Sequence, residues 1–207
     1  MFFERLRMTV VFLLALGVAP GVAQAALVAD TGTPSNAVGA GWAFNSGHSY
    51  AGRFSVLSDL TINSVEGYFS TDAGAVSISL FSNRADGEGG FIPGSALRSA
   101  SFATGLGEAA WHGAAGLNWA VEQGSYWVVF TSTYGSESQA SMPGSVASAL
   151  DGYALEQGGQ WHDAAGLGLD QGLRVDASAM AVPEPGSMAL FGLGLAVVGM
   201  MSRRKRA

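Results

Sequence analysis

Few side chains in this sequence have the types and spacing that chemistry requires. The three histidines, His48, His112 and His162, belong to no H-x-H or H-E-x-x-H pattern. The sequence has no cysteine, which excludes zinc–thiolate sites and disulfides, and it has no G-x-S-x-G nucleophile motif. The carboxylates stand singly rather than as the pair that glycoside hydrolysis needs. We therefore predict no catalytic residue, no metal site and no cofactor, with a secreted hydrolase as the least favoured alternative.

One segment contains two closely spaced carboxylates. Asp86 and Glu88 lie in residues 83–95, where Asp86-Gly87 and Pro93-Gly94 are turn dipeptides and indicate a loop. Calcium takes about six to eight oxygen ligands, so two carboxylates beside glycines supply too few. We expect a long solvated hairpin here rather than a calcium loop.

The tryptophans are the other candidates for chemistry, because an exposed indole ring can stack on a sugar. Trp119 and Trp127 lie in strand-like runs and are expected in the core. Trp111 and Trp161 lie near turns, in the similar heptapeptides WHGAAGL and WHDAAGL, and are the candidates for glycan contact. Packing at the rim of the core is the competing interpretation for both. If the two heptapeptides met in space, their histidines could share a metal, but we expect exposed histidines instead.

The charge between the two ends of the chain limits the partners of this region. Residues 26–181 contain four arginines, no lysine and fourteen acidic residues, a formal charge of −10. Nucleic acid and anionic lipid both require cationic contacts, so neither is an expected partner of this body. The balance suits a soluble exported protein or one that recruits divalent cations.

Hydrophobic periodicity in residues 26–181 predicts strands and no amphipathic helix. Val76, Ile78 and Leu80 alternate with polar residues, which is typical of a strand with one buried and one solvated face. Residues 126–130 are five consecutive large apolar residues, which indicates a central strand covered on both faces. With about nine or ten strands, we predict an all-β sandwich, with a jelly roll as one arrangement.

The N-terminus has the features of a cleaved signal helix. Arg5 and Arg7 precede an apolar run over residues 8–18, and Ala23 and Ala25 are the small residues that signal peptidase recognises. We expect export through the Sec translocon and cleavage after Ala25, with an uncleaved membrane helix as the alternative. The apolar run is short for that alternative. Residues 1–25 are thus a predicted signal peptide, and residues 26–181 a β-sandwich domain.

Residues 182–207 combine a stiff stalk, an apolar run and a basic end. Pro183 and Pro185 restrict their own backbone and that of the preceding residue, so the stretch Val182-Pro183-Glu184-Pro185 is extended. The apolar run 188–201 would form a helix about 21 Å long, against a hydrocarbon core of roughly 30 Å, and residues 185–202 come closer to a span. We predict a single transmembrane helix here.

The basic end predicts the orientation of that helix. Consecutive cations hold a chain end in the cytoplasm by the positive-inside bias, so the body would lie outside the inner membrane. The cations are Arg203, Arg204, Lys205 and Arg206.

These features, in this order, closely resemble the PEP-CTERM sorting signal of Gram-negative bacteria. The resemblance implies recognition by an exosortase, a membrane cysteine protease–transpeptidase that cuts near the Pro-Glu-Pro motif. It also implies export in bacteria that make exopolysaccharide, where such proteins are linked to biofilm matrix. More loosely, residues 76–81, 92–94 and 124–129 are similar to the strand series of β-rich domains that precede such tails.

Together these features predict an exported surface or extracellular-matrix protein that is not an enzyme. It would be anchored transiently in the inner membrane, processed by an exosortase, and moved to the periplasm, outer surface or matrix. A permanent anchor is the alternative fate of the tail. Its role would be structural or adhesive in an exopolysaccharide, and the alternative is a carbohydrate-binding module that uses exposed tryptophans.

Overall fold

The computed structural model describes residues 26–34, 42–45, 47–71, 74–132, 138–140, 150–164 and 171–180. In these residues every regular element is a β-strand and every strand pair is antiparallel, which confirms the all-β prediction. No helix within these ranges is long and apolar enough to span a bilayer. The predicted signal helix and the predicted C-terminal transmembrane helix lie outside them.

The described residues contain twelve strands, more than the nine or ten expected. They are β1 (Ala26–Asp30), β2 (Trp42–Phe44), β3 (His48–Val56), β4 (Leu60–Thr71), β5 (Gly74–Ala85), β6 (Phe91–Thr104), β7 (Gly107–Val121), β8 (Gly124–Ser132), β9 (Ser138–Ala140), β10 (Gly152–Gln157), β11 (Gln160–Asp163) and β12 (Leu173–Ala179). The additional elements include the short strands β9 and β11, which are too brief to show a hydrophobic period.

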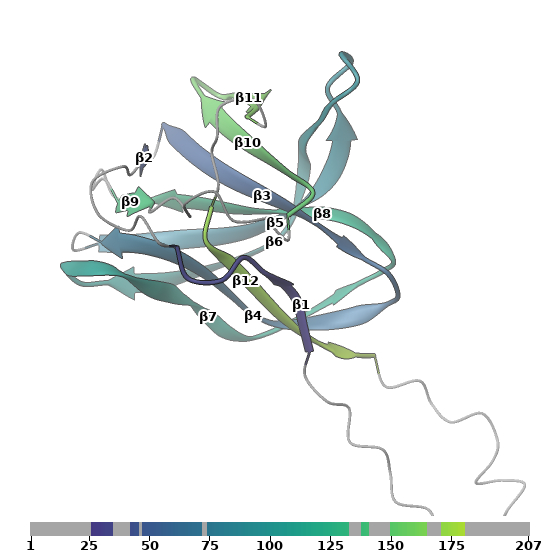
Figure 1. Ribbon diagram of the computed structural model, residues 1–207, viewed down its shortest axis with the longest axis horizontal. Helices are drawn as coiled ribbons and strands as arrows, with labels where there is room; N and C mark the ends of the chain where they lie inside the picture. The colour runs from purple at the N-terminus through teal and green to yellow at the C-terminus, as the bar shows by residue number, and fades with distance from the viewer. Residues whose placement is uncertain are drawn as a thin grey trace, which may run out of the picture.

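The strands form two six-stranded sheets (Figure 1). The first sheet has the order β1-β12-β4-β9-β2, with β7 paired to the other edge of β4, and the second has the order β11-β10-β3-β8-β5-β6. Both sheets contribute side chains to one buried apolar cluster, so they pack face to face as a sandwich. A jelly-roll arrangement stays a prediction.

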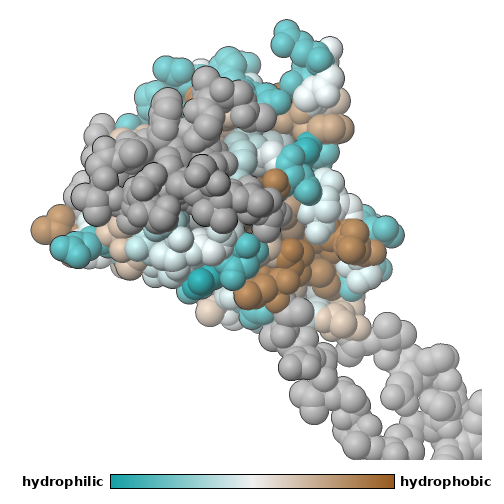
Figure 2. All heavy atoms as spheres, in the orientation of Figure 1, coloured by the Kyte–Doolittle hydropathy of each residue, from teal (hydrophilic) through white to brown (hydrophobic). Residues whose placement is uncertain are grey.

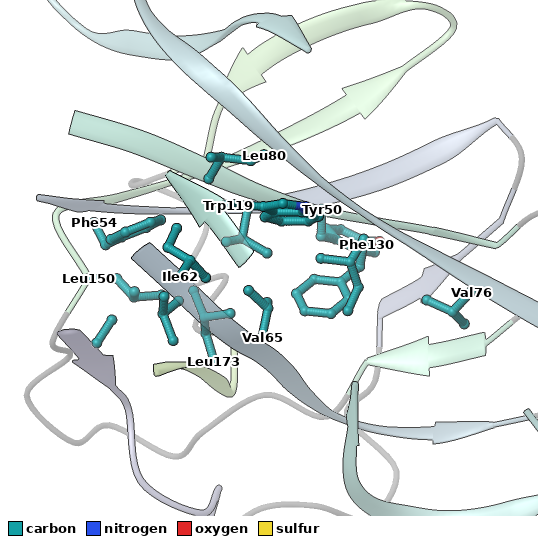
Figure 3. Packing of buried hydrophobic residues seen from close by; sticks show 14 of the residues in the cluster. Tyr50, Phe54, Ile62, Val65, Val76, Leu80, Trp119, Phe130, Leu150 and Leu173 are labelled. Atoms are coloured by element: carbon teal, nitrogen blue, oxygen red, sulfur yellow. The ribbon is translucent and has the colours of Figure 1, made fainter. Parts of the chain in front are cut away.

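Alternation along the strands fills the space between the sheets. Ile62 and Val65 of β4 and Phe130 of β8 all lie in this space (Figure 3), and all three side chains are fully buried. The rings of Phe69 and Phe130 lie 5.7 Å apart in an edge-to-face contact that joins the two sheets.

Strand β8 is covered on both faces, as its apolar run predicts. It lies between β3 and β5, with Val128 and Phe130 in the inter-sheet core. Trp127 and Val129 point the other way and form a second, smaller buried cluster with Ala51 and Ala154. A continuous apolar run therefore marks a strand whose two faces are both dry.

The prediction of a turn around Trp111 was wrong, because the whole segment 107–121 is strand β7. Its small residues allow close approach to β4: a Cβ at position 113 would meet the Val65 carbonyl oxygen and lie 2.7 Å from the Glu66 Cα. The pairing with β4 shifts register after Ala115, and Asn118 has a positive φ of 52°. The residues that favour a turn in isolation thus form an irregularity within a strand.

The predicted loop over residues 83–95 is shorter than expected, because both strands of the hairpin continue into it. Asn83 pairs with Pro93 and Ala85 with Phe91, which leaves 86–90 as the turn. The Asp86 Oδ1 accepts backbone N–H groups from Glu88 at 2.8 Å and Gly90 at 2.9 Å. The hairpin is therefore confirmed, and the Asp86 carboxylate stabilises its turn.

Gly67 is a position where the inter-sheet core leaves no room for a side chain. A Cβ there would lie 2.8 Å from the Phe69 ring and 2.9 Å from the Phe130 ring, and both rings are buried. We expect Gly67→Ala to lower the free energy of unfolding by about 1–3 kcal/mol, measured by urea denaturation, because the rings cannot move aside.

Gly105→Ala is the matched control, since a Cβ at position 105 meets nothing within 4 Å. It should change stability by no more than about 0.5 kcal/mol. Equal stability of the two variants would show that the sheets are not packed this closely at Gly67.

Candidate functional site

Trp111 lies on the outer face of the first sheet, where residues of three elements surround its indole ring. Tyr68, its cross-strand partner on β4, meets it edge-on with ring centroids 5.3 Å apart and an interplanar angle of 72°. The Arg174 guanidinium carbon of β12 lies 3.9 Å from the indole centroid. The indole Nε1 donates to the Thr33 Oγ1 at 3.4 Å.

An ion pair fixes the arginine over the indole. The Arg174 Nε lies 3.2 Å from the Asp30 Oδ1, and both side chains are about one-third exposed, at 31% and 32%. The same Asp30 oxygen accepts the Gly32 N–H at 2.8 Å, which orients the carboxylate. We call this group the Trp111 surface. It consists of Asp30, Thr33, Tyr68, Trp111 and Arg174.

Backbone alternation explains why these residues share one face. On β4, Val65 and Phe69 point into the core, so Glu66 and Tyr68 point outward. Arg174 lies between the buried Leu173 and Val175 in the same way. The register of β7, β4, β12 and β1 then aligns the outward residues across the sheet.

Trp161 lies on β11, on the outer face of the second sheet. Its ring meets Phe81 edge-on at 6.2 Å, and it packs against the cluster that contains Trp127. The Arg53 guanidinium carbon lies 4.7 Å from the Phe91 ring centroid and 5.6 Å from that of Trp127. We call this group the Trp161 surface. It consists of Arg53, Phe81, Phe91, Trp127 and Trp161.

Trp111 lies within strand β7 rather than near a turn, whereas Trp161 lies on β11 just after the Gly158–Gly159 turn, as predicted. The two tryptophans lie in different sheets. Both are half-buried rather than fully exposed. Their neighbouring histidines do not meet. His112 points inward, with its ring centroid 5.2 Å from that of Phe69, whereas His162 is exposed on the edge strand β11. Within the described ranges, no group of three or more His, Cys, Asp or Glu side chains could hold a metal ion.

The sequence pattern alone did not identify the arginines of either surface as site residues. Alternation indicates that Arg53 and Arg174 point away from the core, but it does not identify the rings beneath them. Only the strand register does so, because Arg174 reaches Trp111 from β12 across β4. Two of the four arginines of the body thus lie over tryptophan rings, where cation–π attraction is favourable.

The tyrosines with shifted pKa values belong to neither surface. Burial raises the pKa of Tyr50, whose hydroxyl donates to the Ala43 carbonyl oxygen at 3.2 Å. Burial, together with the Glu122 and Asp59 carboxylates, raises the pKa of Tyr126. Both groups stay neutral near pH 7 and act as hydrogen-bond donors.

The remaining predicted site residues lie outside the described residues. They are Ala23 and Ala25 of the signal-peptidase site, Val182, Pro183, Glu184 and Pro185 of the sorting motif, and Arg203, Arg204, Lys205 and Arg206 of the basic end.

The Trp111 surface should contribute measurably to stability through its arginine. Arg174→Met keeps an aliphatic stem on the indole but removes the charge, so we expect a loss of about 1 kcal/mol in urea denaturation. Arg98→Met is the control, because Arg98 is exposed and its guanidinium donates to the carbonyl oxygen of its chain neighbour Leu97 at 2.8 Å. A loss of the same size in both variants would contradict a specific role for the Arg174–Trp111 contact.

Comparison with known proteins identifies the C-terminal segment. The model of the PEP-CTERM protein-sorting motif matches residues 181–206. No curated protein matches the chain. One solved structure that resembles it contains the cysteine protease and lectin-like domains of Cwp84, a surface layer associated protein of Clostridium difficile. The identity is 10% and the TM-score 0.47, over 66% of this chain and 33% of that chain, so this chain spans about a third of that one.

The match at residues 181–206 confirms the PEP-CTERM resemblance and supports exosortase as the predicted partner. It coincides with the stretch 182–185, the apolar run and all four cations of the basic end. This chain therefore carries a PEP-CTERM sorting motif, the exosortase recognition signal of an exported protein that is processed at the membrane.

Proposed function

We propose that this is a non-enzymatic protein of the cell surface or extracellular matrix, with a structural or adhesive role in an exopolysaccharide layer. The main support for the proposal is the position of the sorting motif directly after the last strand of the sandwich. Strand β12 ends at Ala179, and the sorting motif begins at residue 181, so the sorting segment follows the sandwich almost directly. The sandwich is thus the cargo that exosortase processing delivers.

The composition of the body suits a protein that is exported from the cell. The inter-sheet core is large and continuous, and the chain contains no cysteine, so its stability does not depend on a redox state. The region between the two predicted targeting segments has a formal charge of −10 and no lysine, which favours solubility.

The fate of the tail is tested by mass spectrometry of the mature protein. We expect the chain, produced in a bacterium with an exosortase, to begin at Ala26 and to end near residues 182–185. Glu184→Ala, or deletion of residues 203–206, should leave precursor in the inner membrane. Glu108→Ala, an exposed carboxylate of β7, is the control that should be processed normally. An intact C-terminus in the mature wild-type protein would contradict processing and indicate a permanent anchor.

A second candidate function is glycan binding at the Trp111 surface. An indole flanked by a tyrosine, a guanidinium and a carboxylate combines a stacking plate with hydrogen-bond donors and acceptors for hydroxyl groups. Arg174 already occupies one part of the ring, so a sugar would have to share the ring or displace the arginine.

A glycan array with purified variants tests this candidate. We expect Trp111→Ala to weaken binding roughly tenfold, equivalent to about 1.4 kcal/mol, while the exposed Leu106→Ala leaves it unchanged. Trp161→Ala tests the second sheet separately. Binding that is insensitive to both tryptophan changes would exclude a tryptophan-based site, and release of product from common hydrolase substrates would contradict a non-enzymatic role.

A further inference from the structure

The end of the sandwich at which β1 begins and β12 ends exposes several large apolar side chains. Leu27 of β1, Leu57 after β3 and Met180 after β12 are 56%, 85% and 43% exposed. Figure 2 shows apolar surface gathered at this end of the body, next to the start of β1 seen in Figure 1. We call Leu27, Leu57 and Met180 the exit patch.

Strand order brings the exit patch together. Strand β12 lies between β1 and β4, with Leu27 paired to Asp176 and Ala179 paired to Leu60. Leu57 belongs to the short connection that enters β4 at Leu60. Three exposed large apolar side chains at one end differ from single exposed ones, which are ordinary on protein surfaces.

Leu106 provides the contrast. It is 84% exposed but lies in the turn between β6 and β7, next to Gly107, which pairs with Thr71 at the far end of β4. The twelve residues of β4 therefore separate Leu57 from Leu106, a distance of roughly 36 Å at about 3.3 Å per residue.

The sequence after Met180 limits how the body can face a membrane. Met188, the first residue of the apolar run, is eight positions further along. Even fully extended, eight residues span at most about 29 Å. A body of roughly 155 residues has a radius of gyration of about 15 Å, so it is about 40 Å across. We call the residues between Met180 and Met188 the tether. The tether is shorter than the body is wide, and it starts at Met180 of the exit patch.

We propose that the exit patch rests on the zwitterionic lipid surface of the bilayer while the chain is anchored by its C-terminal segment. This inference rests on the proposed transient anchoring. The nearby charged groups are acidic: Asp59 and Glu122 are exposed, and Asp176 pairs with Leu27. Neutral headgroups therefore suit this end better than anionic ones.

The contact has a consequence for processing. It holds residues 182–185, which directly follow the patch, close to the bilayer where a membrane protease acts. Three apolar side chains bind a bilayer only weakly by themselves, so cutting the tether also releases the body. The patch thus positions the precursor without retaining the product.

A single-site fluorescent probe tests the contact, because the chain has no cysteine of its own. Leu57→Cys and Leu106→Cys place bimane at two positions of matched exposure, 85% and 84%, at opposite ends of β4. The full-length labelled chain is reconstituted into phosphatidylcholine vesicles that contain doxyl-labelled phosphatidylcholine. We expect quenching and a blue shift at position 57 and neither at position 106.

Second variants test the other members of the patch. Leu27→Ser with Met180→Ser, in the Leu57→Cys background, should reduce the quenching without changing co-flotation with the vesicles. Replacing part of the phosphatidylcholine with phosphatidylglycerol should also reduce it, because the surrounding carboxylates are repelled.

The other outcomes overturn the inference in distinguishable ways. Co-flotation with equal signals at positions 57 and 106 would refute the lipid contact and leave the anchoring intact. A blue shift at position 57 that rises with protein density and is not quenched by doxyl lipid would identify a second copy as the occupant. Failure of the wild-type chain to float with the vesicles would refute the anchoring and, with it, the patch.

Discussion

The packing of two sheets through a shared apolar core is the constraint on which the rest of the structure depends. With no cysteine to cross-link it, the body is stabilised by burial of side chains from β3, β4, β5, β8 and β12. The Phe69–Phe130 contact joins the sheets where Gly67 leaves room for both rings. Because that space is full, alternation fixes which residues of each strand face outward.

The outward residues explain the two surfaces. In a body with only four basic residues, two arginines lie over tryptophan rings, one on each sheet. In such a contact the ring attracts the arginine cation, and the arginine side chain shields part of the large ring from water. The Trp161 surface extends a buried cluster, whereas the Trp111 surface stands on a single sheet face. This difference makes the Trp111 surface the better candidate for a ligand.

The topology of the first sheet determines where the sandwich leads into the sorting segment. Strand β12 pairs with both β1 and β4, so the last described strand before the sorting segment lies inside the first sheet. The same arrangement brings the start of β1 and the end of β12 together at one end of the body.

The sequence alone determined the sorting motif, the all-β class and the central strand, because each depends on residues that are close together in the chain. The sorting motif is a proline-containing stretch, an apolar run and cations in order, and the strands show a period of two or a continuous apolar run. The sequence did not determine β7, since glycines and alanines near Trp111 favour turns until tertiary packing presses them against β4. Nor could it pair Arg174 with Trp111, or gather Leu27, Leu57 and Met180 at one end. Those contacts join residues far apart in the chain, and only the strand register brings them together.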